Sequence, residues 1–298
     1  MTVNWIWRVA GVLALLLAVP VMGQETATDY LDAGDIAFEN GAYEEAIKAY
    51  SQAIELEPDN LFALYNRGLA YRFTGFDEAS VEDMTRVVEL DPSDHEALYQ
   101  RARAYYNLGE NALVEADVSA AIAIDAGDAR YFILRGLALR QLGRDEEGVL
   151  DYTKAIAIDE TNEVAWYNRG NYYFDIEDWD EALINYEAAI EIDPTYTNAI
   201  YNRAAVLDNR GDLDEAMAGY EEVIALDPTY VEAYFGRGNI HQAEGRDAEA
   251  IAEFTQVIEL DPEYAMGYHE RGVSYYNLQD WTNAMADFEM TIAIDPTI

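Results

Sequence analysis

A period of 34 residues predicts that this chain folds as an all-α solenoid of eight helical hairpins. Endings similar to "AIELDP" recur, and their prolines are separated by 34 residues or a multiple of it: Pro58, Pro92, Pro194, Pro228, Pro262 and Pro296. Ala126 and Glu160 occupy the two positions where the series lacks its proline. Eight repeats fill residues 27–298 without insertion or deletion, starting at Ala27, Leu61, His95, Ala129, Glu163, Thr197, Val231 and Ala265.

Each repeat is expected to hold two helices joined by a short turn. Most turns contain a glycine, which adopts the left-handed backbone conformation that ends a helix. Acidic residues follow, as in "GDLDEA", and stabilise the positive N-terminus of the second helix. The proline near the end of the repeat then stops that helix. The turn glycines are Gly41, Gly75, Gly109, Gly143, Gly211 and Gly245.

The pattern of residues at fixed positions of each repeat is similar to that of a known family. The fifth repeat carries Trp166, Gly170, Tyr173, Ala182, Tyr186, Ala189 and Pro194 at positions 4, 8, 11, 20, 24, 27 and 32. This pattern resembles the tetratricopeptide repeat (TPR) family, from which Val114, Val118 and Gly148 depart. The resemblance covers residues 27–298 and implies a right-handed superhelix of TPR hairpins, with a concave groove lined by the first helices.

The chain is strongly acidic. Its 298 residues include 58 Asp and Glu against 18 Lys and Arg, giving a formal net charge of -40. This charge repels nucleic acids and anionic lipid surfaces, so nucleic-acid binding is not expected. The acidic surface either keeps a long solenoid soluble or attracts cationic partners, and composition leaves both interpretations open.

Residues 1–23 have the layout of a signal peptide. The segment "MTVNWIWRVAGVLALLLAVPVMG" contains one arginine, an apolar run over residues 9–19, and small residues before Gln24. The run is shorter than the roughly 20 apolar residues of a membrane-spanning helix. An uncleaved N-terminal anchor, with Trp5 and Trp7 at the interface, is the alternative, and membrane contact is expected only through this segment. Residues 24–26 form a short linker, and the expected location is extracytoplasmic: periplasmic, envelope-associated or secreted.

An arginine recurs at position 7, on the face of the first helix that is expected to pack. Because a buried guanidinium is costly without a partner, we expect a structural ladder of ion pairs. Position 23 of the second helix supplies an acidic candidate in five repeats: Asp83, Asp117, Asp151, Glu253 and Asp287. The arginines are Arg67, Arg101, Arg135, Arg169, Arg203, Arg237 and Arg271.

The neighbouring positions 5 and 6 point toward the predicted groove and carry aromatic and amide side chains. Amides donate to and accept from a peptide backbone, while tyrosine adds flat amphipathic contact. An aromatic residue followed by an amide is also a common filling of these positions in the family. The candidate peptide-binding residues are Tyr65, Asn66, Tyr99, Gln100, Tyr167, Asn168, Asn171, Tyr201, Asn202 and Phe235, with Asn171 at position 9.

Four further arginines fall on predicted groove positions of three consecutive repeats: Arg72, Arg103, Arg130 and Arg140. Stacking of these repeats would gather them into one basic groove spot. The guanidinium fork matches a carboxylate or a phosphate of a partner. Pairing with Glu96 or other nearby acids is the alternative.

The sequence contains no pattern that predicts catalysis. It has no cysteine, and His95, His241 and His269 lack metal-ligand spacing. No Gly-rich phosphate loop is present, so no enzyme activity, cofactor or metal is expected.

These features predict a non-enzymatic scaffold that binds an extended segment of another protein in its concave groove. A glycan-binding envelope protein is one alternative, because the same tyrosines and amides suit sugars. A self-assembling structural component is another. No extra polar helix follows the last repeat, so Met285, Ile292 and Ile294 are expected to be exposed and to support self-association.

Overall fold

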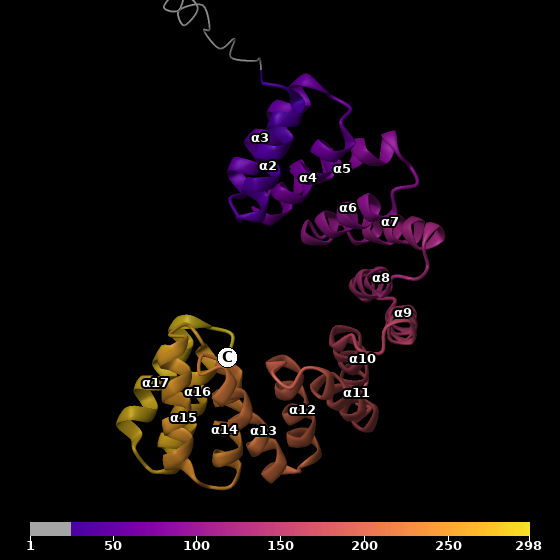
Figure 1. Cartoon of the computed structure of the whole chain (residues 1–298). Coiled ribbons are helices and arrows are strands. Elements are labelled where there is room, and N and C mark those ends of the chain that lie inside the picture. Colours follow the sequence, from indigo (N-terminus) through magenta and orange to yellow (C-terminus); the bar gives the residue numbers. More distant parts are fainter. Residues whose placement is uncertain (1–24) are drawn as a thin grey trace, which may run out of the picture. The chain divides into compact units, whose positions relative to one another are not determined.

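The computed structural model describes residues 25–298, which form sixteen α-helices and no strand (Figure 1). The fold class predicted from the 34-residue period, an all-α series of helical hairpins, is therefore confirmed. The predicted signal peptide or anchor at residues 1–23 lies outside the described residues. Within residues 25–298, none of the helices combines the length and apolar character that crossing a bilayer requires.

The first helix of every hairpin begins at the first residue of a sequence repeat. These helices are α2 (Ala27–Glu39), α4 (Leu61–Phe73), α6 (His95–Asn107), α8 (Ala129–Gln141), α10 (Glu163–Asp175), α12 (Thr197–Arg210), α14 (Val231–Ala243) and α16 (Ala265–Asn277). The second helices are α3 (Tyr43–Leu56), α5 (Asp77–Leu90), α7 (Asn111–Ile124), α9 (Asp145–Ile158), α11 (Trp179–Ile192), α13 (Leu213–Leu226), α15 (Asp247–Leu260) and α17 (Trp281–Ile294).

The helices belong to two compact units. Unit 1 ends at Ala126 and contains α2 to α7, and unit 2 runs from Gly127 to Ile298 and contains α8 to α17. The boundary falls between the third and fourth hairpins, at one of the two sites where the repeat lacks its proline. The 34-residue register continues through it.

Within each unit, a second helix packs both on its own first helix and on the first helix of the next hairpin. First helices also contact each other directly, as α4 does with α6, and α8 with α10, α12 with α14 and α14 with α16. No pair of second helices among residues 25–298 has comparable contact. The first helices therefore form the inner layer of each unit. Their side chains that face away from the second helices share one surface within that unit.

In several hairpins an aromatic ring at position 24 of the second helix packs directly on the first helix. A Cβ atom added to Gly170 on α10 would lie 2.7 Å from Cε1 of Tyr186, which is fully buried on α11. Gly238 has the same relation to Phe254, at 2.6 Å. At these two hairpins glycine at position 8 leaves room for the ring of the second helix, because a side chain there would occupy the same space.

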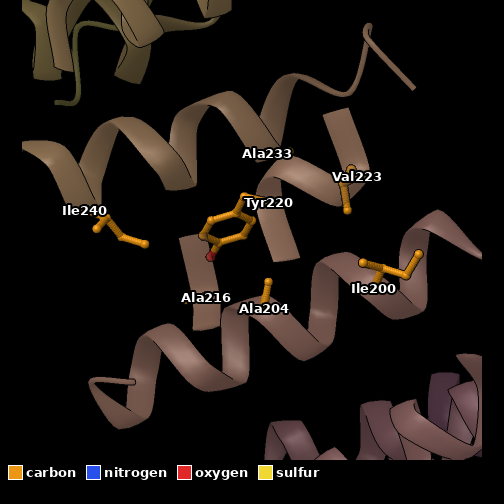
Figure 2. Packing of buried hydrophobic residues seen from close by; sticks show 7 residues of the cluster. All are labelled: Ile200, Ala204, Ala216, Tyr220, Val223, Ala233 and Ile240. Carbon is orange, nitrogen blue, oxygen red and sulfur yellow. The ribbon is translucent and has the colours of Figure 1, made fainter. Parts of the chain in front are cut away.

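The core of unit 2 is continuous from one hairpin to the next. Figure 2 shows Tyr220 of α13 at the centre of a cluster with side chains from α12 and α14. A Cβ atom on Gly236 of α14 would lie 2.6 Å from Cζ of this ring. The same ring thus packs on its own first helix and on the following one. The cluster consists of Ile200, Ala204, Ala216, Tyr220, Val223, Ala233 and Ile240.

The turn inside each hairpin uses a left-handed residue at position 15. Six of these residues are the predicted glycines, with φ between 73° and 84°. The other two are Glu177, at φ 58°, and Gln279, at φ 64°. For residues that have a Cβ atom this conformation is strained.

Replacing Glu177 with glycine is expected to raise the free energy of unfolding by about 0.5–1 kcal/mol, because glycine adopts this turn without a Cβ clash. The matched opposite change, Gly211→Ala at φ 84°, is expected to lower it by a similar amount. Urea denaturation followed by circular dichroism measures both. A loss of stability in Glu177→Gly would contradict the role assigned to this turn.

Candidate functional site

Several position-7 arginines join three helices. In unit 1, Nε and Nη2 of Arg67 on α4 donate to the two carboxylate oxygens of Asp83 on α5, at 2.8 and 2.7 Å. Nη1 of the same guanidinium donates to Oγ of Ser51 on the preceding second helix, α3, at 3.0 Å. The Asp83 hydrogen bonds raise the pKa of Arg67. The same two-bond fork links Arg101 with Asp117, Arg135 with Asp151, and Arg271 with Asp287.

The other ladder arginines use different acceptors. Arg237 makes a single ion pair with Glu253 at 2.8 Å. Arg203 has glycine at position 23 and pairs with Glu222 at 3.1 Å. Arg169 donates to Oδ1 of Asn185 at 2.7 Å.

Arg169 also lies over the ring of Trp166, with Cζ 4.8 Å from the ring centroid. Burial lowers the pKa of its guanidinium. Glu222 and the position-25 hydroxyls that accept from Nη1 were not predicted, because the expected ladder considered only acids at position 23; the recurrence of Ser or Thr at position 25 was the available signal.

The position-5 rings of unit 2 pack between two other aromatic rings. Tyr167 lies 6.0 Å from Tyr186 and 5.0 Å from Tyr196, measured between ring centroids. Tyr201 repeats this with Tyr220 and Tyr230, and Phe235 with Phe254 and Tyr264. Burial raises the pKa of Tyr201 and Tyr196 to about 12, so both hydroxyls stay neutral at ordinary pH. The third ring, at position 34, was not singled out by sequence analysis.

The structure corrects the expectation for some candidate groove residues. Asn168 is 8% exposed, and its Nδ2 donates to the carbonyl of Val164 on its own helix. Gln100 is 6% exposed and donates to Glu96, and Tyr99 is 8% exposed. These three side chains offer little surface to a ligand. Their position-6 or position-5 register is as predicted, but packing covers them.

Two amides on the inner layer of unit 2 form a polar pair. Oδ1 of Asn171 on α10 accepts from the hydroxyl of Tyr186 at 2.8 Å and from Nδ2 of Asn202 on α12 at 2.9 Å. Nδ2 of Asn202 also lies 3.4 Å from the hydroxyl of Tyr167. Asn171 and Asn202 are both partly exposed. We call them the amide pair.

The amide pair has unused hydrogen-bonding capacity. Nδ2 of Asn171 donates to no described residue, and Oδ1 of Asn202 accepts from none. One donor group and one acceptor therefore remain on adjacent first helices. In unit 1, Asn66 is also partly exposed, but its Nδ2 donates to the carbonyl of Phe62 at 2.9 Å.

The predicted basic groove spot is divided between the two units. In unit 2, Arg130 pairs with Asp128 at 2.6 Å, and Arg140 pairs with Asp145 at 3.1 Å and with Asp175. For these two arginines the alternative interpretation, pairing with nearby acids, describes the structure. Arg72 and Arg103 lie in unit 1 and have no such pair.

Two other predicted features can be located. Met285 and Ile292 on α17 are 65% and 59% exposed, and Ile294 is partly buried. Self-association through these residues remains a prediction.

Over residues 25–298, no three His, Cys, Asp or Glu side chains come together in a way that could hold a metal ion.

Family models place the chain among known repeats. A model described as TPR repeat matches residues 34–72, 136–176, 209–245 and 238–279, which together are more than half of the chain. The chain belongs to the tetratricopeptide repeat family. Three further TPR models match residues 63–94, 164–196 and 185–218. A comparison with curated proteins found no significant match.

Several solved TPR structures resemble this one. A crystal structure of MamA protein is 27% identical, with a TM-score of 0.53, and covers 57% of this chain and 93% of its own. YrrB, described as a TPR protein with an unusual peptide-binding site, is 26% identical, with a TM-score of 0.51 and coverage of 60% and 92%. A TPR protein from Parabacteroides merdae ATCC 43184, 19% identical, shows the shared fold alone, with a TM-score of 0.65 and coverage of 83% and 98%.

The arginine ladder of this TPR chain predicts a graded loss of stability. Asp83→Ala is expected to lower the free energy of unfolding by about 3 kcal/mol, because it leaves the partly buried Arg67 guanidinium without its counter-ion. Asp83→Asn is expected to lower it by less than half as much, since Asn185 shows that an amide oxygen can accept from a position-7 arginine. Urea denaturation at neutral pH measures the difference.

The matched control is Asp59→Ala, which removes the exposed ion pair with Arg86. Its expected cost is below about 0.5 kcal/mol because water solvates both charges. If Asp83→Ala were no more destabilising than Asp59→Ala, the structural role of the ladder would be wrong.

Proposed function

We propose that this TPR protein is a non-enzymatic scaffold that binds an extended segment of another protein on the inner layer of its first helices. The amide pair is the observation on which the proposal rests. A peptide group presents one carbonyl and one N–H, and the pair offers the complementary donor on Asn171 and acceptor on Asn202. Such contacts bind the backbone without selecting its side chains.

The amide pair is held in place before any ligand arrives. Asn171 accepts from the hydroxyl of Tyr186, whose side chain is fully buried. Asn202 in turn donates to Asn171. Because both amides are already oriented, a ligand loses less free energy to ordering them.

Aromatic surface lies beside the amide pair. Tyr167 and Tyr201 follow the same first helices at position 5, and both are partly exposed between the rings they contact. Their hydroxyls and flat rings suit the mixed polar and apolar surface of an extended peptide.

The charge of this surface favours a neutral or basic segment. Asp208 on α12 is half-buried beside Tyr220, which donates to it at 3.3 Å, and burial raises its pKa. Glu232 on α14 interacts electrostatically with Tyr201 and Tyr230. Together with the net charge of -40, these acids attract cationic segments and repel acidic ones.

Similarity to YrrB supports a peptide ligand, since that relative is described as having a peptide-binding site. We propose in addition that the protein acts outside the cytoplasm, and the signal-peptide layout of residues 1–23 supports this.

The test selects peptides from a random library on the full chain and compares their affinity for Asn171→Asp. This variant keeps the oxygen that accepts from Tyr186 and Asn202 but loses the unused donor. We expect about tenfold weaker binding with an unchanged melting temperature, because a peptide carbonyl loses its hydrogen bond and gains a repulsive neighbour. Fluorescence anisotropy with the selected peptides gives the affinities.

Asn209→Asp is the matched control. Asn209 lies on α12, is exposed, and uses its Nδ2 on the carbonyl of its own helix, so the variant adds the same charge without removing a free donor. Equal binding by both variants would overturn the proposal. If a glycan array gave ligands where the peptide library gave none, the glycan-binding alternative would replace it.

A further inference from the structure

Arg72 and Arg103 in unit 1 differ from the other arginines of residues 25–298. Every other described arginine donates to a carboxylate or an amide oxygen, including Arg169 through Asn185. Neither Arg72 nor Arg103 makes an ion pair or a hydrogen bond with any described residue. In a chain with 58 acidic residues, two arginines without an acceptor need an explanation.

Arg72 and Arg103 come from neighbouring first helices of unit 1. Arg72 is in the last turn of α4 and Arg103 is in the middle of α6, and these first helices contact each other directly. Burial lowers the pKa of Arg72, and the positive charge of Arg103 lowers it further. Two cations are therefore close enough to repel each other across the inner layer of unit 1.

Aromatic rings orient both groups. Cζ of Arg72 lies 4.7 Å from the ring centroid of Phe73, and Cζ of Arg103 lies 5.8 Å from that of Tyr99. A ring face attracts a guanidinium but accepts none of its in-plane hydrogen bonds. Nε of Arg72 is buried and has no acceptor among the described residues. Such an unsatisfied buried donor is uncommon in folded proteins.

Asp77 on α5 attracts Arg72 but forms no ion pair with it. Oδ1 of Asp77 accepts from Nδ2 of Asn107 at 3.0 Å, and no hydrogen bond joins Asp77 to Arg72. Asp77 is 9% exposed, and it is held on α5 by this contact. Neither arginine therefore has an ion-paired carboxylate among the described residues.

We infer that Arg72 and Arg103 together bind the carboxylate of an acidic side chain in a partner protein segment; this inference rests on the proposed function for the nature of the partner. Each guanidinium can present two parallel N–H donors to a carboxylate. A carboxylate that reaches both groups gains charge-assisted hydrogen bonds and relieves the repulsion between them.

The surrounding charge favours a carboxylate over a phosphate. A phosphate monoester brings a charge of about -2 at neutral pH, whereas a carboxylate brings one negative charge. Because the whole protein has a net charge of -40, each additional negative charge on the ligand is repelled by the rest of the surface. The site would therefore recognise a single acidic residue in an otherwise neutral or basic segment.

The test follows the side-chain Nε–Hε resonances of arginine by NMR in the full chain, at low ionic strength. The probe is the capped tripeptide acetyl-Gly-Glu-Gly-amide, and acetyl-Gly-Gln-Gly-amide is its neutral counterpart. We expect saturable shifts of the Arg72 and Arg103 resonances with the Glu peptide and none with the Gln peptide. This measurement on the unaltered protein does not depend on any variant folding.

Variants then assign the site. Arg72→Gln and Arg103→Gln are each expected to weaken binding of the Glu peptide by about tenfold, since each removes one charged fork. Arg86→Gln is the control, because this exposed arginine of unit 1 already pairs with Asp59 and Glu89 and its loss changes the net charge equally. Arg86→Gln is expected to leave the affinity within about twofold of the original.

Three results would overturn the inference: equal shifts with the Gln peptide, equal weakening by Arg86→Gln, or tighter binding of inorganic phosphate than of the Glu peptide. Failure of the proposed function has a separate signature. If the Glu peptide binds at Arg72 and Arg103 but library peptides bind Asn171→Asp as tightly as the original protein, the anion site stands and the amide-pair proposal fails. The opposite pattern rejects only the anion site.

Discussion

The link from a position-7 arginine to two second helices is the constraint on which the rest of the structure depends. Arg67 donates to Asp83 of its own hairpin and to Ser51 of the preceding one. One planar group therefore sets three helices relative to each other. Together with the close approach of Tyr186 to Gly170, it determines which first-helix side chains face inward and which remain on the surface.

Several side chains beside these arginines pack against buried groups and are also partly exposed on the inner layer. Tyr167 and Tyr201 contact rings from the second helix and from the end of the repeat, yet both keep part of their surface exposed. Asn171 satisfies the hydroxyl of Tyr186 and orients Asn202. The proposed ligand contacts are thus supported by buried groups, which makes them rigid rather than adaptable.

The protein has few basic residues, and nearly all of its described arginines form ion pairs or hydrogen bonds within the chain. Most described arginines have a carboxylate within ion-pair distance, as Arg130 and Arg140 do. Arg72 and Arg103 stand out because rings orient them while no acceptor satisfies them. Because the rest of the protein is strongly acidic, Arg72 and Arg103 form a small basic spot. The proposed selectivity for one acidic side chain depends on this difference in charge.

The sequence by itself determined the helices, the repeat boundaries and the acidic partners of Arg67, Arg101, Arg135 and Arg271, because all of these follow from a fixed 34-residue spacing. It also indicated which positions face inward. Only the tertiary structure decided how exposed each of those residues is. Asn168 and Asn202 share position 6, yet packing buries the first and leaves the second partly exposed beside Asn171. Spacing is a local property of the chain, whereas burial and hydrogen-bond satisfaction depend on what neighbouring hairpins bring into contact.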